Sequence, residues 1–145
     1  MKRITYLFVC FTIFMTSCSK EDTGNGVVEA TITMQRSEGS AIEPDPSALT
    51  FLVPNSGKAI DMEESNLKTG QIWFKGDSKI TNFSRPGFAD QKGVARIENV
   101  TNGKYILIVR SITMYSTTYT DLEVKDNSVV LKKTFKKYDS QNESW

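Results

Sequence analysis

Histidine is missing from all 145 residues of this sequence, and cysteine occurs only twice. Without histidine the chain has no Ser-His or Cys-His nucleophile pair, no imidazole base and no His-ligated zinc or copper. Lys and Arg number 18 against 17 Asp and Glu, so there is no basic excess of the kind that binds nucleic acid. These absences argue against a histidine-based enzyme and against a nucleic-acid-binding protein. The length is that of a single domain.

The N-terminus is predicted to be a signal peptide over residues 1–17. Lys2 and Arg3 precede an apolar run of twelve residues, 4–15. That run has the length of a signal-peptide core, whereas a membrane-spanning helix needs about 20 apolar residues.

The residues after this run carry a resemblance to bacterial lipoproteins. Met15-Thr16-Ser17-Cys18 resembles a lipobox, whose cysteine is acylated and becomes the mature N-terminus. Lys20, Glu21 and Asp22 resemble the export signal that follows this cysteine in Bacteroidetes lipoproteins. The resemblance implies a palmitate-type lipid anchor on Cys18, a short tether over 18–25, and a place in the outer membrane facing the cell exterior.

Beyond the tether the chain is predicted to fold as β-strands. Apolar and polar residues alternate from Val28 to Gln35, the period-2 pattern of a strand with one buried face. Further strands are expected over 49–53, 72–74 and 80–83, and two hairpins are expected, 94–100 with 104–110 and 118–124 with 129–135.

Together these strands predict an antiparallel β-sandwich of about seven strands over 26–138, with a C-terminal tail at 139–145. The arm 104–110 is apolar on both alternating sets of residues, which predicts a central strand. A turn or two over 61–68 is the one helical candidate.

The segment from Asp90 to Tyr105 resembles the signature of carboxypeptidase regulatory-like domains, which have a prealbumin (transthyretin-like) β-sandwich. Gly93 and Gly103 match its turn glycines and Tyr105 matches the tyrosine that opens its next strand, whereas Asn102 belongs to an Asn-Gly turn that stands in place of the family's proline-rich turn. Both glycines are expected to adopt positive φ, and the tyrosine hydroxyl is expected to bond back to the loop backbone. The resemblance implies a non-catalytic module that acts by packing or interaction.

Aromatic side chains are the candidate binding residues, because flat rings stack on sugars or anchor protein contacts. Tyr115 and Tyr119 lie in the polar run 113–119, which is expected to be an exposed loop. Trp73 stands between Ile72 and Phe74 and is either part of the core or exposed.

Two charged clusters receive structural interpretations. The acidic cluster Asp61, Glu63 and Glu64 is interpreted as a solvated loop, in preference to a glycosidase pair or a calcium site. The lysines of the last arm are interpreted as edge-strand residues that oppose aggregation, in preference to an anion site; they are Lys132, Lys133, Lys136 and Lys137.

The sequence therefore predicts a non-catalytic cell-surface lipoprotein that acts as a protein-interaction or scaffolding module, with no cofactor and no metal. The alternative is a carbohydrate-binding accessory lipoprotein. An exposed strip of Trp73, Tyr115 and Tyr119 would favour the glycan, and an apolar patch at an open sheet edge would favour a protein partner.

Overall fold

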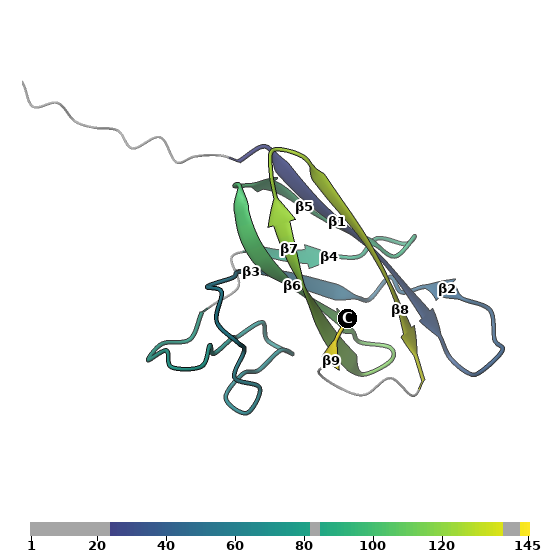
Figure 1. The fold of residues 1–145 in the computed structure, drawn as a ribbon. Coiled ribbons are helices and arrows are strands. Elements are labelled where there is room, and N and C mark those ends of the chain that lie inside the picture. The colour runs from purple at the N-terminus through teal and green to yellow at the C-terminus, as the bar shows by residue number, and fades with distance from the viewer. Residues whose placement is uncertain (1–23, 82–84, 138–142) are drawn as a thin grey trace, which may run out of the picture.

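The computed structural model describes residues 24–81, 85–137 and 143–145, which form a two-layered β-sandwich (Figure 1). The predicted all-β class is confirmed. The described residues contain no helix, and so none that could cross a bilayer. The signal peptide, Cys18 and the export signal Lys20, Glu21 and Asp22 lie outside the described residues. The strands are β1 Gly26–Gln35, β2 Glu43–Pro44, β3 Leu49–Pro54, β4 Arg85–Phe88, β5 Val94–Val100, β6 Gly103–Ser111, β7 Ser116–Val124, β8 Ser128–Lys136 and β9 Glu143–Ser144.

Two sheets share these strands. In sheet A, β1 pairs with β8 along one edge and with β5 and then β2 along the other. Sheet B has the order β4-β3-β6-β7-β9. Most pairs are antiparallel, as predicted, and the pairs β1/β8 and β7/β9 are parallel. β9 lies within the segment 139–145, which is predicted to be a C-terminal tail. The sequence gives no sign of this strand because two residues are too few to show an alternating pattern.

Neither predicted hairpin forms. β5 belongs to sheet A and β6 to sheet B, and β7 and β8 are likewise divided between the sheets. Each turn therefore carries the chain from one layer to the other, and the N–H of Asp126 donates to Oδ1 of Asn102 at 2.7 Å to link the two crossings. An Asn-Gly turn signals a chain reversal but does not specify that its arms share a sheet. β6 pairs with β3 and β7 on its two edges, which confirms the predicted central strand.

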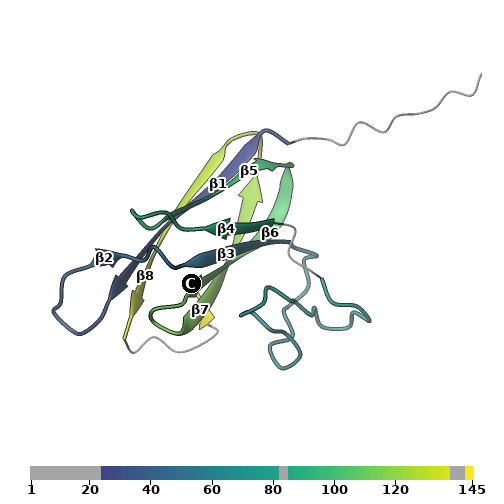
Figure 2. The same ribbon diagram turned by 180° about the vertical axis from the view of Figure 1, so that it is seen from behind.

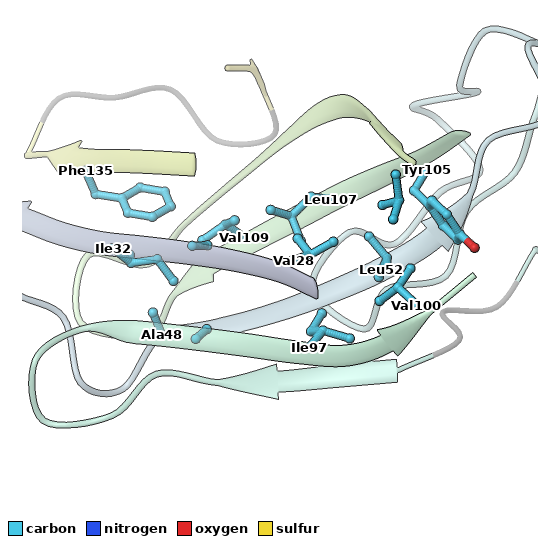
Figure 3. Close-up of a cluster of buried hydrophobic side chains, with 13 residues drawn as sticks. Val28, Ile32, Ala48, Leu52, Ile97, Val100, Tyr105, Leu107, Val109 and Phe135 are labelled. Atoms are coloured by element: carbon cyan, nitrogen blue, oxygen red, sulfur yellow. The ribbon is translucent and has the colours of Figure 1, made fainter. Parts of the chain in front are cut away.

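Inward-facing side chains of both sheets form the main core (Figure 3). Val28, Ala30 and Ile32 of β1 are buried, and the intervening residues are partly exposed, so the alternation predicted for this strand is confirmed. They pack with buried residues of both sheets, which include Leu52, Leu107, Val109 and Phe135. Burial of these apolar side chains is the main source of stability for such a domain.

The turn residues matched to the regulatory-like domains behave as predicted at two of three tested points. Gly93 has φ 75°, and a Cβ there would lie 2.2 Å from the carbonyl oxygen of Ile32. The Tyr105 hydroxyl donates to the carbonyl of Thr101 at 3.0 Å. Gly103 does not adopt positive φ, because it opens β6 in an extended conformation.

The connection between β3 and β4 is the largest departure from the prediction. Residues 55–81, called here the excursion, form an irregular lobe on the side of the sandwich away from β1 and β8 (Figures 1 and 2). The strand predicted at 72–74 is wrong, and so is the strand predicted at 80–83 over its two described residues, 80 and 81. Within the described residues Ile72 and Phe74 make isolated bridges, to Thr81 and Ile60 respectively. Turns replace the helical candidate 61–68.

Excursion side chains bury the outer face of sheet B. Leu67, Ile72 and Phe74 form a second apolar cluster with residues that point away from the main core, namely Phe51, Val53, Ile106 and Ile108. This cover explains why β3 and β6 are apolar on both faces. It also shows why 72–74 has strand-like alternation without belonging to a sheet, because two buried residues there flank a half-buried Trp73.

β8 forms an edge of sheet A, as its lysines predicted. Lys132 and Lys136 are exposed, and Lys133 stands opposite the inward-facing Ile32 in the register of β1. The Lys133 ammonium lies 5.7 Å from the centre of the Phe135 ring. An inward charge on an edge strand opposes pairing with another sheet.

Candidate functional site

A cleft of about 800 Å³ lies between the start of the excursion and the outer face of β6 and β7. Ile106 of β6 and Tyr119 of β7 supply its apolar floor, with Ile60 of the excursion on the opposite wall. Its polar lining comes from Asn55, Lys58, Lys104, Asp121 and Glu123.

Strand alternation places the β6 and β7 residues together. In the antiparallel register Lys104 stands opposite Glu123, and Ile106 opposite Asp121. Cross-strand partners project from the same face of a sheet, and this face is the outer one because Ile106 belongs to the cluster under the excursion. The polar residues therefore form a group at the end of the sheet where β6 begins and β7 ends.

Asn55 anchors the excursion wall to the two strands. Its backbone N–H donates to the Lys104 carbonyl at 2.9 Å, and its Nδ2 donates to Oδ1 of Asp121 at 2.9 Å. Its Oδ1 accepts the N–H of Gly57 at 2.7 Å, which turns the chain at the mouth of the cleft. One side chain thus ties the wall to β6 and β7 and orients an acidic residue.

The charges around the cleft are partly compensated. Lys58 pairs with Asp77 of the excursion, and Glu123 pairs with Lys125 at 2.9 Å. Within the described part of the chain Lys104 and Asp121 form no ion pair. The cleft therefore offers one cation and one carboxylate to a ligand, above an apolar and aromatic floor.

The three predicted binding aromatics occupy separate places. Tyr119 lines the cleft, but it lies in β7 and is half-buried, so its expected place in a loop is wrong. Tyr115 is 78% exposed in the turn between β6 and β7, at the opposite end of those strands, with φ 54°. Trp73 is half-buried in the excursion outside the lining of the cleft, and its backbone N–H donates to Ser65 Oγ at 2.8 Å.

Sequence reasoning missed most of the polar lining. Tyr119, Asp121 and Glu123 do alternate with smaller or apolar residues, and this period-2 pattern was the available signal. Asn55 and Lys58 gave none, because they are brought to β7 only by the path of the excursion.

A second polar group lies inside the fold. Asp45 is fully buried and accepts hydrogen bonds from the hydroxyls of Ser47, at 2.9 Å, and Ser111. Thr113 Oγ1 lies 2.9 Å from Ser47 Oγ. The group ties the residues before β3 to the turn after β6, which is a structural role.

The acidic cluster at 61–64 is a turn. Oδ1 of Asp61 accepts the N–H groups of Glu63 and Glu64 at 3.2 and 3.4 Å, and both glutamates are exposed. Across residues 24–81, 85–137 and 143–145 no group of three or more acidic or cysteine side chains is placed to hold a metal ion.

Comparisons with known proteins give distant structural neighbours. No family model and no curated protein matches the chain. The minor pilin of Streptococcus agalactiae is 16% identical with a TM-score of 0.48, over 81% of this chain and 46% of that one. A candidate carbohydrate-binding protein from Pseudomonas aeruginosa is 16% identical with a TM-score of 0.43, over 79% and 92%. The major pilin subunit of Bacillus cereus is 16% identical with a TM-score of 0.42, over 77% and 30%. The chain thus spans about half the length of the streptococcal pilin and a third of the Bacillus one.

Proposed function

We propose that this chain is a non-catalytic interaction module of the cell surface, and that a partner protein docks in the cleft between the excursion and β6–β7. The observation that carries the proposal is the cleft itself, in which an apolar floor is ringed by a cation, Lys104, and a carboxylate, Asp121, that form no ion pair within the described residues. Protein contacts are built in this way, with an apolar centre and a polar rim.

Two further observations favour a protein over a glycan. Trp73, Tyr115 and Tyr119 do not form the exposed strip that a sugar platform would need, because Tyr119 alone lines the cleft. In addition, β9 covers only two residues of β7, so part of an open sheet edge adjoins the cleft.

A non-catalytic role agrees with the lining of the cleft. The residues that line it are Asn, Lys, Ala, Ile, Tyr, Asp, Leu and Glu, with one glycine, and include neither serine, threonine nor cysteine. A Ser, Thr or Cys nucleophile activated by a base, one common arrangement for covalent catalysis, therefore has no counterpart in this lining.

A carbohydrate remains the second candidate ligand, because of one local feature. The Tyr119 ring shares the cleft with the Asn55–Asp121 pair, and a flat ring beside an amide and a carboxylate suits a single sugar unit.

We further propose that Cys18 is lipidated and holds the domain at the outer membrane. Gly24, where the described chain begins, packs so closely on β5 that a Cβ there would lie 2.1 Å from the Val100 carbonyl oxygen. The first described residue of the domain therefore lies next to the turn between β5 and β6. Mass spectrometry of the mature protein should find acyl chains that Cys18→Ser abolishes and that the control Cys10→Ser leaves in place.

Site-specific cross-linking in intact cells tests the docking proposal. A photo-reactive residue replaces Lys58 in the cleft wall or, as the control, Lys92 in the turn before β5. The proposal predicts a protein adduct from position 58 that is absent from position 92 and is lost in Ile60→Asp. Equal adducts at both positions would refute it. The carbohydrate would be favoured if position 58 gives no protein adduct and if the protein binds a glycan array in a way that Tyr119→Ala abolishes.

A further inference from the structure

We propose that the open edge of β7, from Thr120 to Val124, accepts an extended segment of the partner protein as an added β-strand. This inference rests on the proposed function and specifies how the partner binds. The partner segment that would fit this edge alternates apolar with polar residues and places a Lys or Arg opposite Asp121.

The unpaired edge of β7 is the first support. β6 pairs with β7 along all nine residues, whereas β9 pairs only with Thr118 and Tyr119 on the other edge. The N–H of Trp145 donates to the Tyr119 carbonyl at 2.9 Å, so the backbone groups of Tyr119 point to the β9 edge. Backbone groups alternate in direction along a strand, and those of Asp121 and Glu123 therefore point to the same edge.

These groups are open to an incoming strand. Within the part of the chain that the structure describes, the Asp121 carbonyl receives a long contact, 3.5 Å from the Thr120 hydroxyl, and Asp121 and Glu123 are both exposed. β9 also shows that this edge accepts a strand. Unpaired backbone N–H and C=O groups in a row are the template for strand addition.

Two other edges of the described sandwich, β8 and β4, carry protection that this one lacks. β8 has Lys132, Lys136 and the inward-facing Lys133, and β4 is four residues long and contains Pro86. Between Thr120 and Val124 there is no proline, and the inward-facing side chain near the edge is Leu122 rather than a charge.

The two sides of β7 define the residues that an added strand would meet. On the outer side Tyr119, Asp121 and Glu123 line the cleft. On the inner side Leu122 is half-buried against the main core, as are Val129, Leu131 and Trp145. An added strand places its side chains alternately on these two sides, so polar residues face the cleft and apolar residues face Leu122.

The charges lining the cleft indicate which polar residue the added strand should carry. Lys125 compensates Glu123, Lys104 stands opposite Glu123 on the β6 side, and Lys58 is paired with Asp77. Asp121 accepts one hydrogen bond from Asn55 and has no cation near enough to pair with it within the described residues. A Lys or Arg of the partner facing Asp121 would supply the missing charge.

Backbone pairing is tested with a matched pair of variants. Glu123→Pro removes an N–H from the open edge without removing a bond to β6, and Glu123→Ala removes only the side chain. The probe is a short peptide of alternating valine and lysine, with glutamate in place of lysine as its control, added to the full lipoprotein in detergent micelles. We expect Glu123→Pro to weaken peptide binding at least tenfold, Glu123→Ala less than threefold, and Asp121→Asn to reduce the preference for lysine over glutamate. Equal loss in the proline and alanine variants would overturn the inference.

Amide hydrogen exchange provides a readout that needs no variant. In the free protein the Asp121 and Glu123 amides should exchange faster than those of Thr120 and Leu122, and the valine–lysine peptide should slow them at least tenfold. Unchanged exchange at saturating peptide would overturn the inference, as would slow exchange in the free protein caused by its own C-terminal residues or by a second copy. If the Lys58 cross-link persists in Glu123→Pro, the cleft binds its partner without strand addition, and only this inference fails.

Discussion

The two outer faces of the sandwich differ in chemistry and in what covers them. The outer face of sheet A is polar: Arg96 pairs with Glu29 at 3.6 Å and with Glu98 at 2.9 Å, and Thr33 and Thr134 share a hydroxyl contact of 2.8 Å. The outer face of sheet B is apolar and is buried by the excursion. Sheet A thus has one polar face and one buried face, whereas sheet B is buried on its inner face and, where the excursion covers it, on its outer face as well.

This difference accounts for the position of the cleft. The excursion covers β3 and the middle of β6 but stops short of the end of β7, where Asp121 and Glu123 are exposed. An apolar face that is covered only in part leaves a pocket with an apolar floor and a polar rim. Sheet A has no cover of this kind among residues 24–81, 85–137 and 143–145, and its alternating strands need none.

Removal of an apolar anchor of the cover should have the largest effect. Phe74→Ala deletes a fully buried ring between the excursion and sheet B and should lower the free energy of unfolding by about 3–5 kcal/mol. Thr31→Ala, on the outer face of sheet A, should change it by less than about 0.5 kcal/mol. Urea denaturation measures both, and similar values for the two would remove the distinction between the faces.

Loss of the polar anchor should have a smaller effect on stability. Asn55→Ala removes the hydrogen bonds to Asp121 and Gly57 and should cost about 1 kcal/mol, because the residue is partly exposed. It should also weaken the Lys58 cross-link, since the wall loses its attachment to β7. The control elsewhere in the excursion is Asn66→Ala, because Oδ1 of Asn66 accepts the Lys68 N–H at 3.2 Å and the residue lies outside the lining of the cleft. A cross-link unchanged in Asn55→Ala would show that this anchor does not shape the site.

Removal of a charge from the polar outer face of sheet A should have a still smaller effect on the free energy of unfolding. Arg96→Ala breaks two exposed ion pairs and should cost less than about 1 kcal/mol. The cost should shrink further in 1 M salt, which screens exposed charges. Thermal unfolding at two salt concentrations measures it, and a salt-independent loss would indicate packing rather than charge.

The smallest effect is expected at the turn that leads into β5, and it depends on pH. The N–H groups of Val94 and then Lys92 donate to Oδ1 of Asp90 and hold the pKa of that carboxyl below its ordinary value of 3.8. A carboxyl whose pKa is lower in the folded protein than in the unfolded chain stabilises the fold at pH values above its unfolded-state pKa. This stabilisation is lost as the pH falls through its folded-state pKa. The difference in melting temperature between wild type and Asp90→Ala should be constant from pH 5 to 8 and shrink below about pH 3.8. A difference that grows in acid would contradict the assignment.

Regular alternation made much of the framework predictable. β1, β3, β6, β7 and β8 lie within a few residues of their predicted ranges, and the Tyr105 hydroxyl bond was also predicted. The pairing of these strands was not, because local turn chemistry does not encode whether two arms share a sheet. The sequence around Asn102 is typical of a hairpin turn, but in the structure this turn carries the chain from one sheet to the other.

The site was less predictable for a related reason. Asn55 and Asp121 form their hydrogen bond 66 positions apart in the chain, and the irregular excursion that brings them together has no periodic pattern. Tyr119 was identified as an aromatic, but its neighbours in the cleft become apparent only when β6 and β7 are set in register.

Hydroxyl-radical footprinting of the protein, on intact cells and after purification, tests most directly whether the partner occupies the cleft of the covered face. The account predicts that Tyr119 and Ile60 are oxidised less on cells than in the purified protein. Val130 on sheet A, 58% exposed, and Tyr115 in the far turn should be oxidised equally in both states. Protection of Val130 or Tyr115, with Tyr119 and Ile60 unchanged, would place the partner elsewhere and contradict the account.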